Sequence, residues 1–166
     1  SHSWKQISIE NNGDTVRVQP GITGAMVNAH LKKYSKKIGP DPASINAAMM
    51  GGIVSNNSSG MCCGVSLNSY HTVKYLRFIL HNGNTYSTEN KADYTKFETS
   101  ENELFSNLIA LRTTILSNTE LRDRIRKKYL TKNTVGYSLN AFIDFEHPLD
   151  ILAHLLIGAE GTLAFI

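Results

Sequence analysis

The sequence predicts an α+β fold. Pairs of segments in which apolar and polar residues alternate meet at strong turn signals, and longer segments repeat apolar residues every three or four positions. The chain also lacks a regular strand–helix–strand alternation and an internal repeat, which argues against a parallel α/β sheet. Its 166 residues, 41% hydrophobic and 19% charged, have the length and composition of one globular domain.

The first predicted element is a β-hairpin. Residues 4–10 alternate, residues 11–14 form an Asn-Asn-Gly-Asp turn signal, and residues 15–19 return as a second strand. We expect the inner face of this hairpin to carry Trp4, Ile7, Ile9, Val16 and Val18.

A helix follows, with Thr23 as its predicted cap. Its apolar face is expected to hold Val27, Leu31 and Tyr34. Positive charge in a last helical turn suits the helix dipole, and that turn is expected to hold Lys36 and Lys37.

Residues 40–64 are unlike the rest of the chain, since they combine two prolines, four glycines and a polar run. Ser44 is a candidate cap for a short helix over residues 45–50. The Gly51-Gly52 pair allows a ligand or another backbone to approach closely, and residues 55–60 offer hydroxyl and amide donors. From composition alone, this segment is either a diphosphate site built from main-chain amides or a glycine-rich packing corner.

The middle of the chain predicts a second hairpin and a helix. Residues 72–80 form a strand, and residues 84–88 pair back onto it. Ser100 and Glu103 fit a capping box at the start of the helix. The apolar stripe of this helix is expected to contain Leu104, Phe105, Leu108, Ile109, Leu111 and Ile115.

Two further helices and a last strand complete the predicted elements. A helix over residues 119–129 is followed by a loop over residues 132–140, a helix that begins at Pro148 and a strand over residues 162–166. The buried residues of the two helices are expected to be Leu121, Ile125 and Tyr129, and then Leu149, Leu152 and Leu156.

A second candidate site precedes the last strand. Residues 158–162 read Gly-Ala-Glu-Gly-Thr, so that glycines bracket the single carboxylate of Glu160. This carboxylate can accept hydrogen bonds from ribose hydroxyls or from amides. The alternative is a structural turn in which Glu160 pairs with a nearby lysine.

Charge and hydropathy exclude several classes of function. The net charge is only +3, and the basic clusters at residues 32–37 and 122–128 are interpreted as solvated helix faces, so we expect no nucleic-acid partner. The longest apolar stretches are far short of a membrane span.

The cysteines and histidines predict no metal site. Cys62 and Cys63 are adjacent and no third cysteine exists, so a disulfide framework is excluded and a reducing compartment, the cytoplasm, is expected. Buried packing is favoured for the cysteine pair over a redox or metal role. The spacing of His147 and His154 is interpreted as coincidence.

In order along the chain, these motifs resemble the FAD-linked oxidase family, whose PCMH-type FAD-binding domain occurs in D-lactate dehydrogenases, glycolate oxidase subunits and D-2-hydroxyglutarate dehydrogenases. The resemblance lies in residues 18–23 (Val-Gln-Pro-Gly-Ile-Thr), 39–44, 51–60 and 158–166. Residues 60–70 and 132–142 resemble the branch of large D-lactate dehydrogenases, some of which are fused to iron–sulfur domains.

The resemblance implies an FAD site. The channel for FAD would be lined by Pro40, Asp41, Pro42, Ala43, Ser44, Gly51, Gly52, Ser55, Asn56, Ser58 and Gly60, with the amides near residues 52–56 facing the diphosphate. Cys63, Gly64 and Tyr70 would lie toward the isoalloxazine, and Glu160, Gly161 and Ile166 would bound the cofactor from the last strand. The family has a serine where this chain has Ala159.

The resemblance also implies domain boundaries. Residues 1–60 correspond to the end of a first FAD-binding α+β subdomain and residues 61–166 to the second. The family's first phosphate loop and its substrate domain have no counterpart here. We therefore expect a domain truncated at both ends, with no catalytic residue or metal ligand of its own, weak or no FAD binding in isolation, and iron–sulfur clusters only in other parts of the parent chain.

The implied function of the intact protein is flavin-dependent oxidation of a D-2-hydroxy acid such as D-lactate, glycolate or D-2-hydroxyglutarate. Its partners would be this small acid and an electron acceptor, and peripheral attachment to the inner face of a membrane stays open. One alternative is another PCMH-type flavoenzyme, such as the reductase of peptidoglycan precursor synthesis. The other is a scaffold or interaction module that no longer binds flavin.

Overall fold

The computed structural model describes residues 4–60 and 63–166, which fall into two compact units, Ser1–Thr72 and Val73–Ile166. Strands and helices occur in both units, so the predicted α+β class is confirmed. The predicted boundary of the family's subdomains, between residues 60 and 61, stays a prediction.

The first unit begins with the predicted hairpin. Strands β1 (Ile7–Glu10) and β2 (Thr15–Val18) are antiparallel, with Ile7 opposite Val18. The short 3-10 turn η1 (Asn11–Gly13) joins them through three residues with positive φ. The Asn-Asn-Gly sequence suits this backbone, since these residue types tolerate the left-handed region best.

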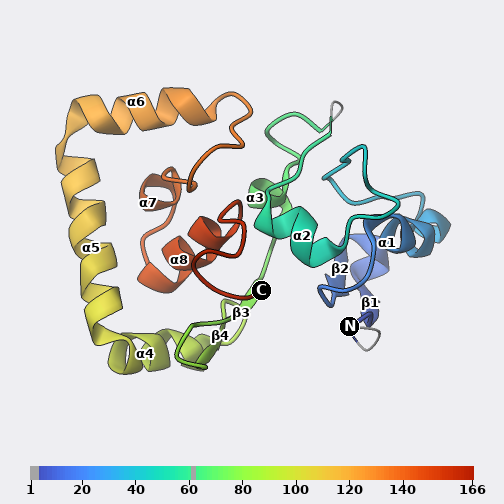
Figure 1. The fold of residues 1–166 in the computed structure, drawn as a ribbon, viewed down its shortest axis with the longest axis horizontal. Helices are drawn as coiled ribbons and strands as arrows, with labels where there is room; N and C mark the ends of the chain where they lie inside the picture. Colours follow the sequence, from blue (N-terminus) through green and yellow to red (C-terminus); the bar gives the residue numbers. More distant parts are fainter. Residues whose placement is uncertain (1–3, 61–62) are drawn as a thin grey trace. The chain divides into compact units, whose positions relative to one another are not determined.

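The remaining elements of the first unit are short helices (Figure 1). Helix α1 (Gly24–Leu31) is capped as predicted, because the Thr23 hydroxyl accepts a hydrogen bond of 3.3 Å from the Met26 amide. It is followed by the 3-10 turn η2 (Lys32–Tyr34), helix α2 (Met50–Ser55) and helix α3 (Ser69–Thr72).

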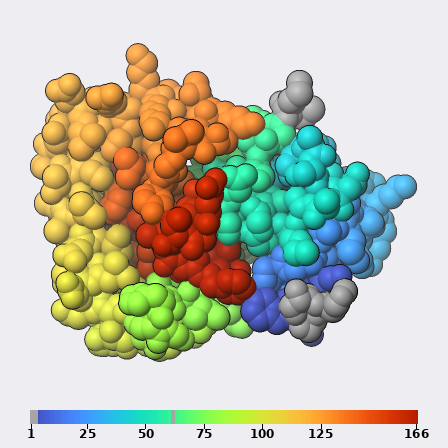
Figure 2. Space-filling view, in the orientation of Figure 1, coloured from blue at the N-terminus to red at the C-terminus, as the bar shows by residue number. Residues whose placement is uncertain are grey.

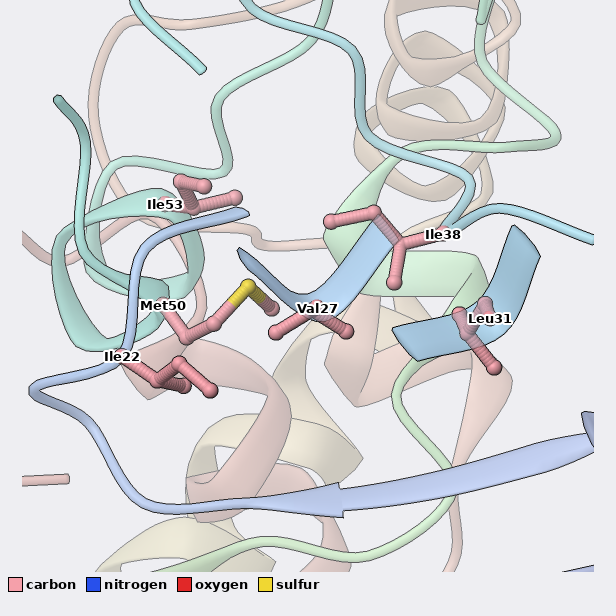
Figure 3. Close-up of a cluster of buried hydrophobic side chains, with 6 residues drawn as sticks. All are labelled: Ile22, Val27, Leu31, Ile38, Met50 and Ile53. Atoms are coloured by element: carbon pink, nitrogen blue, oxygen red, sulfur yellow. The ribbon is translucent and has the colours of Figure 1, made fainter. Parts of the chain in front are cut away.

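The core of the first unit lies between α1, α2 and the hairpin. Figure 3 shows its buried members, Ile22, Val27, Leu31, Ile38, Met50 and Ile53. The alternating residues Ile7, Ile9, Val16 and Val18 pack against it. Trp4 was also expected on this face but is 42% exposed, because β1 begins only at Ile7 and the alternation of a strand does not extend back to residue 4.

Two further predictions in the first unit are wrong. The helix that starts at Gly24 ends before Lys36 and Lys37, because Ser35 takes a left-handed φ of 56°. Instead of serving the helix dipole, Lys36 pairs with Asp14, and Lys37 pairs with Asp41 at 3.2 Å.

The second wrong prediction is the helix over residues 45–50. Turns occupy residues 43–47, and the helix starts at Met50, so the Gly51-Gly52 pair lies in its first turn. The Ile45 carbonyl, which a helix there would use, accepts from the Ala25 amide at 3.0 Å. Tertiary hydrogen bonds to α1 therefore override the local helix signal.

The second unit combines a small hairpin with five helices in the described residues. Strands β3 (Arg77–Ile79) and β4 (Thr85–Ser87) pair antiparallel as predicted, although β3 is shorter than residues 72–80. The helices are α4 (Lys91–Ser100), α5 (Asn102–Ser117), α6 (Thr119–Tyr129), α7 (Ala141–Asp144) and α8 (Pro148–Leu156). Helix α5 contacts α6, α7 and α8, so that the long helices border the two inner ones (Figure 1).

Two helices of the second unit match their predictions closely. Helix α6 spans the predicted residues, although Leu121 is 37% exposed and only Ile125 is fully buried. Helix α8 starts at Pro148 and buries Leu149, Leu152 and Leu156 as expected. The predicted loop over residues 132–140 is also confirmed.

The start of α5 was predicted wrongly. Ser100 is the last residue of α4, a helix that the sequence analysis missed, and it does not cap α5. Only Phe97 of α4 is buried, which left no apolar stripe to recognise. In α5, Leu108 and Ile115 are buried, whereas Leu111 is 52% exposed.

The predicted last strand is reduced to a single bridge. The main chains of Ile79 and Phe165 exchange hydrogen bonds of 2.8 and 3.0 Å, and no ladder extends on either side among the described residues. Residues 160–163 are exposed. The C-terminal part of the chain, drawn in red, is visible at the surface in Figure 2.

Candidate functional site

The structure brings the two glycine- and proline-rich segments of the first unit together. Gly60 touches the main chain of Asp41 so closely that an added Cβ would overlap with the Asp41 carbonyl oxygen. Pro40 and Pro42 are buried, whereas Ala43 and Ser44 are exposed. The two segments that were predicted to line one channel, residues 40–44 and 51–60, therefore meet at Asp41 and Gly60.

The two adjacent glycines of α2 have different surroundings. A Cβ on Gly51 would lie 2.7 Å from Cβ of Pro20, and the Gly51 amide donates to the Pro20 carbonyl at 3.0 Å. Gly52 is exposed, and a Cβ there would meet nothing within 4 Å. The Gly52 amide has no acceptor among the described residues. Gly51 thus serves packing, and Gly52 presents open main chain with a free donor.

The polar run after these glycines ends α2 in an ordered way. Asn57 adopts φ 44°, and the Ser58 amide donates to the Ile53 carbonyl at 2.8 Å, which is the pattern of a helix closed by a left-handed residue. The Asn57 side chain accepts from the Tyr70 amide at 3.1 Å and so ties α2 to α3. Sequence reasoning gave Asn57 no role, although an asparagine just past a helix is a known signal for this closure.

The other polar residues of this run stay accessible to different degrees. Asn56 is exposed and donates to the Ser58 hydroxyl at 3.2 Å, and Ser55 is half-buried. These side chains lie at the C-terminal end of α2, the same short helix that contains Gly52 in its first turn.

Cys63, Gly64 and Tyr70 follow within the first unit. Cys63 is buried, as the packing interpretation expects, and its thiol lies 3.6 Å from the Gly60 carbonyl and 3.4 Å from that of Gly64. Cys62, the other member of the predicted pair, lies outside the described residues. Tyr70 is only 5% exposed, and the predicted contacts of these residues with an isoalloxazine stay predictions.

In the second unit, Glu160 lies in a turn of left-handed residues. Gly158, Glu160 and Gly161 have φ of 95°, 54° and 76°. Glu160 is exposed, and its carboxylate has no hydrogen-bond or ion-pair partner in the part of the chain that the structure describes, so no lysine pair explains it. Ile166 is half-buried. An unpaired carboxylate on a strained backbone is available to a ligand.

The candidate metal and membrane features add nothing to this site. Within residues 4–60 and 63–166, no group of three or more His, Cys, Asp or Glu side chains could hold a metal ion. His147 caps α8 by accepting from the Leu149 amide at 3.1 Å, and His154 stacks on Phe145 with ring centres 3.7 Å apart. None of the described helices is long and apolar enough to cross a bilayer.

A family model described as FAD binding domain matches residues 1–89, more than half of the chain. The chain belongs to the FAD binding domain family. The matched residues include the whole of the segment from Pro40 to Tyr70, and they end before the Glu160 turn. The family to which the sequence motifs pointed is therefore confirmed.

Three D-2-hydroxyglutarate dehydrogenases are similar to this FAD binding domain. It is 30% identical to a D-2-hydroxyglutarate dehydrogenase of Pantoea ananatis over 99% of the chain, 31% identical to that of Haemophilus influenzae over 91%, and 27% identical to that of Escherichia coli over 99%. The chain spans only about 15–16% of the length of these relatives. No solved structure gives a significant match.

Proposed function

We propose that this chain forms part of the FAD site of a flavin-dependent dehydrogenase that oxidises a D-2-hydroxy acid. The observation that carries the proposal is the open main chain at Gly52, inside the segment that matches the FAD binding domain family. The names of the similar proteins make D-2-hydroxyglutarate the first substrate to test, ahead of D-lactate and glycolate.

The surroundings of Gly52 suit a diphosphate. Its amide is free to donate, and an oxygen of the ligand can approach because no side chain intervenes. The close contacts of Gly51 with Pro20 and of Gly60 with Asp41 hold the backbone on both sides. The donor is therefore already oriented before the ligand arrives, which lowers the entropy lost on binding.

The Glu160 turn suits the hydroxyl-bearing part of the cofactor. A carboxylate accepts hydrogen bonds from ribose or ribityl hydroxyls, and the charged acceptor makes such bonds stronger than neutral ones. When bound, FAD supplies the hydride acceptor for oxidation of the substrate carbon. We assign the residues of this chain to binding and orientation of the cofactor and none of them to proton transfer.

The first experiment uses Gly52→Val in the full-length protein. Valine and glycine both lie low on the helix propensity scale and the site has room for a side chain, so the fold should persist while the flavin content falls below about a tenth of the wild-type value. Far-UV circular dichroism and flavin per mole of protein are measured together. Ala29→Val, at an exposed position of α1 outside the site, is the matched control.

Normal flavin content in Gly52→Val would contradict the assignment of this segment. The substrate is tested separately by anaerobic mixing of the flavin-loaded protein with each of the three acids, and D-2-hydroxyglutarate is expected to bleach the flavin fastest. A colourless full-length protein that cannot be reconstituted with FAD would favour the scaffold alternative.

A further inference from the structure

The turn that carries Glu160 is held from both sides by the loop after α6. Before the turn, the Ser138 hydroxyl donates to the Ile157 carbonyl at 2.9 Å and is buried there. After the turn, the Tyr137 hydroxyl and the Thr162 hydroxyl share a hydrogen bond of 3.0 Å. Tyr137 and Ser138, adjacent residues of one loop, thus form hydrogen bonds on both sides of the Glu160 turn.

The direction of the second hydrogen bond follows from proton counting. The Thr162 hydroxyl donates its single proton to the Ala159 carbonyl at 2.6 Å, and the Thr162 amide donates to the same carbonyl at 3.0 Å. Tyr137 must therefore be the donor to Thr162. The result is a relay from Tyr137 through Thr162 to Ala159 that closes the turn around Glu160, and successive bonds in such a relay strengthen one another.

The loop is anchored in turn to α6. The hydroxyl of Tyr129, the last residue of that helix, donates to the Tyr137 carbonyl at 2.7 Å and accepts from the Leu139 amide at 3.1 Å. The end of a regular helix thereby sets the position of Tyr137, and Tyr137 sets the position of the turn.

The pair of hydroxyls contributes little to the core. Tyr137 is 42% exposed and Thr162 is also exposed, so their hydrogen bond competes with water and stabilises the fold only weakly. The bond instead reaches Thr162, the residue whose hydroxyl and amide close the strained turn around Glu160 by donating to the Ala159 carbonyl.

We propose that Tyr137 is a positioning residue for FAD, which acts through Thr162 to hold the Glu160 carboxylate in the orientation that the cofactor requires. This inference rests on the proposed role of the Glu160 turn in FAD binding. It assigns a function to residues of the loop that neither the sequence analysis nor the family match placed at the site.

The test measures FAD dissociation constants of variants of the full-length protein. Tyr137→Phe and Thr162→Val each remove one hydroxyl without changing the side chain's shape much, and each should weaken FAD binding roughly threefold to tenfold. Thr162→Ser keeps the hydroxyl and should restore wild-type affinity. The rescue would show that the hydroxyl, and not the shape of the side chain, is what FAD binding requires.

A double substitution shows whether Tyr137 acts through Glu160. In a Glu160→Ala background, Tyr137→Phe should weaken FAD binding no further, because the carboxylate that it positions is gone. Tyr94→Phe is the control: it removes a 2.7 Å hydrogen bond to Asp150 in the same unit and should lower thermal stability without changing the dissociation constant.

Three results would overturn the inference: unchanged affinity in Tyr137→Phe, an equal loss of affinity in the Glu160→Ala background, or a Glu160→Ala variant with wild-type affinity. The first two results leave the proposed FAD function intact, and the third removes only the Glu160 turn from it, because Gly52→Val tests the other FAD segment separately.

Discussion

Glu160 occupies a backbone conformation in which glycine would be less strained. A non-glycine residue with φ of 54° loses about 1–2 kcal/mol relative to the right-handed region. Since the exposed Glu160 side chain forms no bond that stabilises the turn, folding gives no reason for a carboxylate at this position, whereas the proposed FAD contact does.

Glu160→Gly should therefore separate stability from function. We expect the free energy of unfolding to rise by up to about 1 kcal/mol, offset in part by the greater flexibility of glycine in the unfolded chain, while FAD affinity falls. Denaturant unfolding of the apoprotein and FAD titration measure the two effects. A loss of stability in this variant would contradict the interpretation that the positive φ of residue 160 strains the backbone.

The Glu101 carboxylate accepts hydrogen bonds from three neighbouring side chains. Burial acts to raise its pKa, but hydrogen bonds from Asn84 at 2.7 Å, from Asn82 at 3.0 Å and from Tyr86 at 2.8 Å outweigh that effect and leave the pKa below its ordinary value of 4.5. Burial and the same carboxylate raise the pKa of Tyr86 to about 12.

The protonation of Glu101 makes the stability of the fold depend on pH. Because the folded protein holds the pKa of Glu101 below its unfolded value, the stability from this carboxylate is complete above pH 4.5 and is lost as the pH falls through the lower folded pKa. Glu101→Gln should lower stability at neutral pH and flatten the acid branch of a plot of urea midpoint against pH. An unchanged acid branch would mean that other carboxylates cause it.

At the scale of elements, α8 depends on a histidine cap. The Nδ1 atom of His147 accepts from the Leu149 amide, which requires that nitrogen to be unprotonated. Burial lowers the pKa of His147, against the opposite effect of Asp150 and Glu98, and its ring packs edge-on to Tyr94 at 4.6 Å. The folded state therefore disfavours the proton.

This cap predicts a second pH dependence at milder acidity. Since the folded pKa of His147 lies below the ordinary 6.5, its contribution to stability is present above pH 6.5 and is lost as the pH falls through the folded value. His147→Asn, which keeps a capping acceptor, should remove this dependence between about pH 5 and pH 8. His30→Asn, in the other unit, is the control and should leave it unchanged.

The elements that sequence alone predicted are those with complete local signals. The first hairpin has alternation on both sides of an Asn-Asn-Gly turn, and α8 has a proline start and a continuous apolar face. Helix α4 has only one buried residue, so nothing periodic marked it. The helix over residues 45–50 failed because α1 takes the carbonyl that it needed, a tertiary contact that no local pattern contains.

The candidate site was predictable to a similar extent. The order of the glycine-containing motifs along the chain indicated the segment at Gly51-Gly52. It did not indicate that one glycine serves packing while the other stays open. The hydrogen bond between Tyr137 and Thr162 joins a loop and a turn that α7 and α8 separate in the sequence. Such a contact becomes visible only when the chain is folded.

At the scale of the whole molecule, the candidate cofactor residues belong to both compact units, and the contribution of each unit is testable by itself. A ligand that binds only the folded state raises its stability by about 2.7 kcal/mol at a hundred times its dissociation constant. FAD should therefore raise the melting temperature of the full-length protein. Gly52→Val and Glu160→Ala should each reduce this shift, and a variant that keeps the full shift would show that the substituted residue does not bind FAD.

The contrast between Gly60 and Gly52 has a consequence for mutational scanning. Any side chain at residue 60 meets the Asp41 main chain, so every substitution there should reduce the amount of protein in the cell. Substitutions at residue 52 meet nothing within the chain and should lower abundance only as far as the loss of bound flavin destabilises the protein. A saturation library sorted once for abundance and once for retained flavin would thus separate positions constrained by folding from those constrained by the cofactor, and so outline the flavin surface without a liganded structure.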